Sequence, residues 1–240
     1  MKEVKIAGIA GLIYFFSIVT QTIGMRFTTA SKAGFLTGLN VILVPIIVAI
    51  VFKKSISKKL WVAVILATIG TYIMSFTGLE LVTIGDPLVI ICALLYAIYI
   101  IYIDRKAKDI DIYRFSQLQL LFITIASFGI SAIIEDWHSI FTMKASMIFT
   151  LDHFLWLIYI GIAVTSLTFI FQVYGQRYIN ETKTSLIFSL EPIFATVFAV
   201  LWGNEFLSVQ LYIGSILIFI GILIPSIKRN NKRDVKNDFP

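Results

Sequence analysis

Eight long apolar segments, separated by short polar connections, constrain this chain more than any other feature of its sequence. They cover residues 5–25, 33–52, 60–78, 85–103, 114–134, 152–175, 183–203 and 208–227. Each segment is long enough to cross a hydrocarbon core of about 30 Å as an α-helix. Helices satisfy their own backbone polar groups, as lipid requires, and no segment shows the alternation of a barrel strand. The pattern predicts an all-α polytopic membrane protein with eight transmembrane helices.

The composition excludes the soluble classes of protein. Hydrophobic residues make up 58% of the 240 residues and charged residues 14%, whereas soluble domains carry about 25% charged residues. A soluble fold of this size does not bury so much apolar surface, which excludes a soluble enzyme, a disordered chain and a nucleic-acid-binding domain. The net charge of +6 is therefore interpreted as basic cytoplasmic loops. The single cysteine, Cys92, excludes an intramolecular disulfide and is expected to be a small packing residue.

The distribution of Lys and Arg predicts the orientation. If the basic tail is cytoplasmic, eight spans place the amino terminus on the same side, and only Arg26, Lys32 and Lys144 of the 20 Lys and Arg residues lie outside. The positive-inside rule therefore predicts a multi-pass protein of the cell membrane with both termini cytoplasmic. Segment 5–25 is too long for a signal peptide and no cleavage motif follows it. Residues 135–151 are expected to lie on the outer membrane surface, with Trp137 as an interfacial anchor.

An internal repeat relates the two halves of the chain. Two stretches align without a gap at an offset of 151 positions. The shared residues include the pairs Gln21 and Gln172, Gly24 and Gly175, Arg26 and Arg177, Lys32 and Lys183, Ser57 and Ser208, and Gly70 and Gly221. Matching spans cross the membrane in opposite directions, so the repeats are predicted to be inverted, as in many secondary transporters with a central substrate site.

The offset also predicts the domain organisation. Residues 1–80 form an incomplete first repeat of three helices, residues 81–228 a second repeat of five helices, and residues 229–240 a basic cytoplasmic tail. The start of the second repeat near Gly85 corresponds to a position about 66 residues before Met1, which leaves room for two spans. Two interpretations stay open: a truncated gene product, or an eight-helix form that lacks one helical hairpin.

Three runs of sequence resemble the EamA-type carriers of the drug/metabolite transporter superfamily. Residues 26–40 are similar to the core of the first repeat, residues 186–195 to a helix of the second repeat with its Glu191-Pro192 motif, and residues 203–205 to a Gly-Glu turn. The resemblance implies a ten-helix bundle of two inverted five-helix repeats that exports amino acids, metabolites or toxic compounds by alternating access. The chain departs from the family in lacking the first two helices, and in having Lys53-Lys54 where a Gly-Glu pair is common.

Glu191 is the strongest candidate for a functional side chain, because a carboxylate about eight residues into a span must face the bundle interior or a cavity. It is interpreted either as a proton-coupling or substrate-amine site, or, with Pro192, as a structural group at a helix break. Asn40 is its repeat partner. The remaining candidates for a substrate or proton pathway are Gln21, Gln172, Tyr96, Tyr99 and Tyr14. The polar candidates either contact a solute or join two helices.

Helical spacing orders the remaining candidates. Tyr96 and Tyr99 share a helix face, whereas Gln117 and Gln119 point about 200° apart and cannot face the same way, so one of the two is expected to meet the pore or the headgroups. Other aromatic side chains that are candidates for a pocket are Trp156, Tyr159 and Tyr174. The residues predicted to pack helices of the two repeats together are Gly34 and Gly38, which form a small-x-x-x-small pattern, with their repeat partners Ser185 and Ser189, and Pro192.

These observations predict a transporter and no enzyme. The sequence contains no nucleophile motif, phosphate loop, cysteine pair or metal-ligand spacing, so no cofactor or metal is expected. The leading hypothesis is a secondary transporter of small organic solutes such as amino acids, metabolites or drugs, working as an exporter. The alternative is a non-transporting membrane scaffold or partner subunit. The expected partners are a small-molecule solute, membrane lipid and a second copy in a homodimer, and no nucleic acid.

Overall fold

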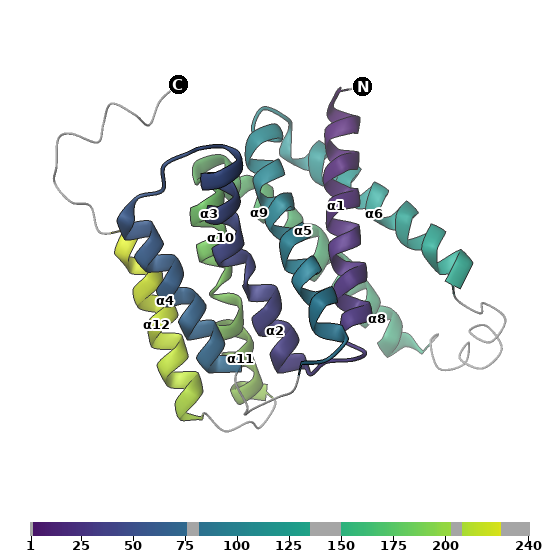
Figure 1. Cartoon of the computed structure of the whole chain (residues 1–240). Coiled ribbons are helices and arrows are strands. Elements are labelled where there is room, and N and C mark those ends of the chain that lie inside the picture. The colour runs from purple at the N-terminus through teal and green to yellow at the C-terminus, as the bar shows by residue number, and fades with distance from the viewer. Residues whose placement is uncertain (1, 76–81, 135–149, 203–207, 227–240) are drawn as a thin grey trace.

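A computed structural model describes residues 2–75, 82–134, 150–202 and 208–226, and all regular structure in these ranges is helical (Figure 1). The first half comprises α1 (Lys2–Gly24), α2 (Ala30–Gly38), α3 (Asn40–Val51), α4 (Lys58–Ser75), α5 (Gly85–Lys106) and α6 (Ile112–Ile134). The second half comprises α8 (Leu151–Tyr159), the π-helical turn η1 (Ile160–Ser166), α9 (Leu167–Tyr178), α10 (Glu181–Phe188), α11 (Glu191–Trp202) and α12 (Val209–Ser226). The predicted all-α class is confirmed for the described part of the chain.

Six helical segments in the described ranges are long and apolar enough to cross a membrane. They are Lys2–Gly24, Lys32–Val51, Lys58–Ser75, Gly85–Lys106, Ile112–Ile133 and Leu151–Tyr178. The segment Val209–Pro225 is a shorter apolar helix, and the predicted span 183–203 is divided between α10 and α11. Trp137, the turn at residues 203–205 and the basic tail lie outside the described residues.

Two helices are interrupted near their middle, and the interruptions occur at equivalent positions of the sequence repeat. In the first repeat, Thr29 caps α2 by accepting a hydrogen bond from the Lys32 amide at 3.3 Å, and the helix breaks at Leu39. In the second, Asn180 caps α10 by accepting one from the Lys183 amide at 2.9 Å. There the break follows at residues 189–190. Each cap satisfies a backbone donor that a helix start leaves free.

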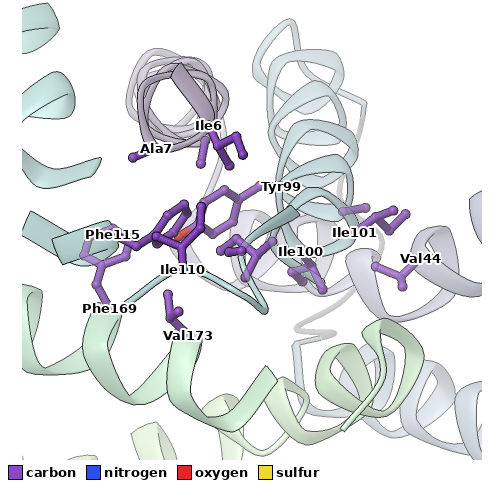
Figure 2. Packing of buried hydrophobic residues seen from close by; sticks show 14 of the residues in the cluster. Ile6, Ala7, Val44, Tyr99, Ile100, Ile101, Ile110, Phe115, Phe169 and Val173 are labelled. Carbon is purple, nitrogen blue, oxygen red and sulfur yellow. The ribbon is translucent and has the colours of Figure 1, made fainter. Parts of the chain in front are cut away.

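The bundle is described below by its two faces. The amino-terminal face is the one at which α1 begins, at the top of Figure 1, and α5 ends there before α6 begins. The opposite face is the one at which α1 ends and α5 begins. Tyr99, Phe115, Phe169 and Val173 form a buried cluster in the half near the amino-terminal face (Figure 2).

Small residues allow the closest helix contacts in the described bundle. α4 and α12 lie side by side (Figure 1), and a Cβ atom added at Gly70 would lie 2.6 Å from the Gly214 carbonyl oxygen. A Cβ atom at Gly221, the repeat partner of Gly70, would lie 2.8 Å from the Ala63 carbonyl oxygen. Backbones that approach this closely gain van der Waals contact, the main attraction between helices in lipid.

Candidate functional site

A cavity of about 450 Å³ lies between the two interrupted helices. Its lining extends from residues at mid-bundle to Met74 and Ser75, which end α4, and to Leu211 near the start of α12. All of these outlying residues are near the opposite face. No lining residue comes from the turns of the described helices that meet the amino-terminal face. The cavity therefore belongs to the half of the bundle toward the opposite face, and the buried cluster of Tyr99, Phe115, Phe169 and Val173 lies in the other half.

Both helix breaks contribute polar groups to the cavity. Asn40 and Glu191, which are partners in the sequence repeat, both line it. The Asn40 amide nitrogen donates to the Thr37 carbonyl at 3.0 Å, and the Ser189 hydroxyl donates to the Leu186 carbonyl at 2.6 Å. Glu191 is the one carboxylate among the described lining residues, and no Lys or Arg lines the cavity with it. The cavity thus presents a single acidic group within a largely neutral, hydrogen-bonding wall.

Aromatic rings form one side of the cavity. The ring centroids of Tyr96 and Phe188 lie 6.1 Å apart and nearly parallel, and those of Tyr14 and Tyr96 lie 6.2 Å apart. All three rings line the cavity. The rings come from α1, α5 and α10, so helices from both sequence repeats build this wall. Such a surface suits a flat or apolar part of a solute.

Tyr99 and Gln172 are placed outside the lining, although both were predicted for the pathway. Tyr99 is fully buried one turn from Tyr96 toward the amino-terminal face, and its hydroxyl accepts a hydrogen bond from the Gln119 amide at 2.6 Å. Gln172 is buried, and its amide nitrogen has no hydrogen-bond partner in the described part of the chain. Gln119 is buried and Gln117 is exposed, as the helical spacing predicts.

The predicted Gln21 takes part in a hydrogen-bonded edge of the cavity. Its amide nitrogen donates to the Thr37 hydroxyl at 3.1 Å, and that hydroxyl donates to the Ala33 carbonyl at 2.8 Å. One turn earlier on α1, the Ser17 hydroxyl donates to the Cys92 carbonyl at 3.1 Å. Sequence reasoning did not assign Thr37, Cys92 or Phe188 to the lining. Cys92 was detectable, because it lies four residues before Tyr96 and so shares its helix face.

The residues predicted to pack helices together occupy different environments. Gly34 lines the cavity, and a Cβ atom added there would meet no atom within 4 Å. A Cβ atom added at Gly38 would lie 3.0 Å from the Thr71 methyl group. Ser185 is fully buried, whereas Ser189 and Pro192 line the cavity. The additional pocket candidates Trp156, Tyr159 and Tyr174 are exposed on α8 and α9, away from the cavity.

Asp86, at the start of α5, forms an ion pair and hydrogen bonds with residues at the start of α2 and just before it, at the opposite face. Its carboxylate lies 2.6 Å from the Lys32 ammonium, and it accepts hydrogen bonds from the Thr28 hydroxyl at 2.8 Å and the Thr83 amide at 2.9 Å. The side chain of Asp86 is 6% exposed. An anion in the first turn of a helix also interacts favourably with the helix dipole. Among the described residues, no three His, Cys, Asp or Glu side chains are arranged to hold a metal ion.

Comparison with known proteins identifies the family. The model of the EamA-like transporter family matches residues 2–76 and 83–227. An uncharacterized transporter of Archaeoglobus fulgidus is 30% identical over 220 residues, which cover 91% of this chain and 67% of that protein. The uncharacterized transporter YyaM of Bacillus subtilis is 24% identical over 229 residues, which cover 92% of this chain and 72% of that protein.

A solved crystal structure shares the fold. Its chain superposes with a TM-score of 0.74 at 14% sequence identity, covering 94% of this chain and 85% of the other. At this identity the likeness concerns the arrangement of helices alone. Together with the apolar helices and the extent of the family match, the comparisons show that this chain is a multi-pass membrane transporter and belongs to the EamA-like transporter family.

Proposed function

We propose that the chain is a secondary transporter of small organic solutes, such as amino acids, metabolites or drugs, that exports its solute through the central cavity by alternating access. The observation that carries the proposal is the meeting of two interrupted helices at one cavity, where Asn40 and Glu191 face the same space. Interrupted helices near the membrane midplane expose polar backbone groups where a solute can bind.

The matched geometry of the helix caps supports two inverted repeats. Thr29 and Asn180 cap equivalent helices. Ser57 and Ser208 likewise accept hydrogen bonds from Leu60 and from Leu211, each at 3.3 Å. We assign the amino-terminal face to the cytoplasm, because most Lys and Arg residues lie in connections at that face or in the terminal segments. The cavity then faces the outside of the cell.

Counterflow in proteoliposomes tests the proposal. Liposomes that contain the full chain are loaded with one unlabelled solute, and uptake of a labelled panel of aromatic amino acids, aliphatic amino acids, nucleosides and cationic drugs is measured. We expect saturable uptake for one class of solute. A variant with Gly34→Trp fills cavity space without a clash at its Cβ position, and it should abolish that uptake while the protein remains monodisperse. Monodisperse protein that exchanges no solute from any class would contradict the proposal.

Glu191 provides a sharper test of the cavity. If it binds a proton or a substrate amine, Glu191→Gln removes the charge but keeps the shape, and we expect pH-driven transport to fall at least tenfold while the yield of folded protein stays unchanged. Ser185→Ala is the matched control, because Ser185 is buried on the neighbouring helix but does not line the cavity. Loss of folded protein with Glu191→Gln would favour a structural role at the helix break.

One observation favours a scaffold or partner subunit as the second candidate. No residue of α8 is buried, and a Cβ atom added at Gly175 in α9 would meet no atom within 4 Å. A helix face that no other helix of the described bundle covers can bind another membrane protein. Purification in mild detergent distinguishes the two candidates: a stoichiometric helical partner with no counterflow supports the scaffold, and counterflow by the lone chain excludes it.

A further inference from the structure

Two carboxyl groups and three cations gather where α5, α10 and the connection between α3 and α4 meet at the amino-terminal face. The Glu181 carboxylate lies 3.6 Å from the Lys54 ammonium and 3.9 Å from the Arg105 guanidinium. Asp104 pairs with Lys108 one turn further along, at 2.9 Å. The Glu181 side chain is 2% exposed and that of Asp104 is 10% exposed. This carboxyl cluster is separate from the cavity, because neither Asp104 nor Glu181 lines it.

The chain brings Lys54 to this cluster by an unusual backbone turn. Lys53 has φ of 50°, the one positive value for a non-glycine residue in the described chain, and this left-handed conformation costs free energy for a residue with a Cβ atom. On the other side, the Arg105 guanidinium stacks 3.5 Å from the centroid of the Phe52 ring. Lys54 and Phe52 belong to the first sequence repeat, and Glu181 and Arg105 to the second. The cluster therefore joins the two repeats at one face.

The two carboxyl groups need a proton between them. Apart from the ion pair of Asp104 with Lys108, the buried atoms Asp104 Oδ1 and Glu181 Oε2 have no hydrogen-bond partner in the described part of the chain. Two ionised carboxylates only accept hydrogen bonds and repel each other. A proton held by Asp104 supplies the missing donor. Burial opposes ionisation of Glu181, but this hydrogen bond and the two cations outweigh it and hold the Glu181 pKa below its usual value.

The other charged groups on the elements that pack against α10 are exposed or bind a different partner. At the end of α9, the Arg177 guanidinium donates to the Ile110 carbonyl. Lys58 and Lys59 at the start of α4 are exposed. Lys183, on α10 itself, is exposed as well. α12 carries no charged residue within Val209–Ser226. Toward α5, Glu3 of α1 is partly exposed and pairs with Arg114 at 3.1 Å, and Asp109 and Asp111 are exposed. Glu181 and Asp104 are therefore the buried acidic groups at this corner of the bundle.

We propose that Asp104 and Glu181 form a proton-binding site that holds the amino-terminal face closed, and that the site releases its proton to the solvent at that face when the face opens. Closed, the pair binds one proton and Glu181 holds Lys54 and Arg105. When the face opens, α5 and α10 separate and water surrounds each carboxyl group. Each group then ionises with a pKa of about 4. One proton leaves as H⁺ and no covalent bond between heavy atoms changes. This proposal rests on the proposed function in one respect: the face is taken to open so that a solute can pass.

Proton linkage gives the direction of the effect. The closed state binds one more proton than the open state, so raising the pH favours opening. The dependence is at most about tenfold per pH unit for a single proton. This pH dependence of opening begins above a pH of about 4, where water-exposed carboxyl groups are ionised. It ends at the pH at which the closed pair also loses its proton.

Thiol accessibility measures the opening without any solute. The full chain with Cys92→Ser and Ser185→Cys is placed in nanodiscs, because Ser185 is fully buried one turn beyond Glu181. A water-soluble maleimide labels the thiol introduced at position 185 only when the face opens. The same protein with Lys183→Cys in place of Ser185→Cys carries an exposed thiol on the same helix. The ratio of the two labelling rates removes the intrinsic effect of pH on thiol reactivity.

Two isosteric variants should shift this ratio in opposite directions. Asp104→Asn supplies a permanent donor to Glu181, and we expect slower labelling at position 185, at least threefold at pH 8, with little dependence on pH. Glu181→Gln removes the charge that holds Lys54 and Arg105, and we expect labelling at least fivefold faster, again with little dependence on pH. Asp109→Asn, an exposed carboxyl three residues beyond the α5 helix, is the control and should behave as the parent protein does.

The outcomes separate this proposal from the proposed function. Unchanged ratios in both variants, with exposed position 183 labelled normally, would overturn the proton site even if counterflow is found. The expected opposite shifts would support the proton site even if no solute in the panel is transported. A parallel shift of both variants toward faster labelling would also overturn it, because that result indicates simple loss of packing at the corner.

Discussion

α1 and the continuous helix α8–η1–α9 align in the sequence repeat, yet they have different surroundings in the bundle. α1 buries Ala7, Ala10 and Phe15 against α5 and α6, whereas α8 buries no residue and η1 buries none. In α9, by contrast, Phe169 and Val173 are buried. The aligned segments are similarly apolar. Apolar character therefore decides that both helices enter the membrane, but it does not decide which parts of them are covered by other helices.

The size of the side chains accounts for the difference. α1 carries a stripe of small residues, Ala7, Gly8, Ala10 and Gly11, where the helices approach closely, and a Cβ atom at Gly11 would lie 2.8 Å from the Gln119 carbonyl oxygen. The aligned positions of α8 and η1 include the bulky Ile158, Tyr159 and Ile162. Small residues favour helix contact in lipid, and bulky apolar side chains suit contact with lipid tails.

The largest expected effect distinguishes the aligned glycines Gly24 and Gly175. A Cβ atom at Gly24 would lie 2.8 Å from a Val89 methyl group and 2.9 Å from the Gly85 carbonyl oxygen, whereas one at Gly175 meets nothing within 4 Å. We expect Gly24→Leu to lower the free energy of unfolding by about 1–3 kcal/mol through overpacking, and Gly175→Leu to change it by less than about 0.5 kcal/mol. Thermal unfolding in one detergent, followed by tryptophan fluorescence, measures both. Equal destabilisation would show that another segment covers Gly175.

The second prediction concerns Ile6 and the residue aligned with it, Leu157. Ile6 is buried, whereas Leu157 is 58% exposed. Truncation of Ile6 to alanine leaves a cavity between helices, and we expect a loss of about 1–2 kcal/mol. This is below the range for soluble cores, because lipid is itself apolar and the transfer part of the loss is therefore small. Leu157→Ala should have no measurable effect on the same unfolding curve. A clear loss with Leu157→Ala would contradict the assignment of this face to lipid.

The smallest effect separates two serine hydroxyls. Ser17 on α1 donates to the Cys92 carbonyl of α5, whereas Ser166 donates to the Gly161 carbonyl within its own helix at 2.8 Å. We expect Ser17→Ala to cost about 1 kcal/mol, because it leaves a buried acceptor with one partner fewer. Ser166→Ala should cost less than about 0.5 kcal/mol. Urea titration of both variants in the same micelles tests the order, which fails if Ser166→Ala is the more destabilising change.

Part of the cavity was predictable from the sequence. The repeat directed attention to Asn40, Glu191 and Gln21, and the structure places all three in the cavity lining. Tyr99 was not separable from Tyr96, because two residues three positions apart share a helix face and only the neighbouring helices decide which of them reaches a cavity. The helical period did separate Gln119 from Gln117, since residues two positions apart point away from each other.

The sequence by itself determined that the chain is helical, that it enters the membrane, and where most of its apolar segments begin and end, although it predicted 33–52 and 183–203 as single spans that the structure breaks at Leu39 and at residues 189–190. It did so because lipid forces backbone polar groups to pair within each helix, so length and apolar character suffice. Only the tertiary structure decided which faces are covered by protein, and which distant charges meet. The approach of Lys54 to Glu181 depends on the packing of three helices and on the left-handed turn at Lys53. No local pattern encodes such a contact, because its partners are separated by more than a hundred residues and are joined only when the bundle assembles.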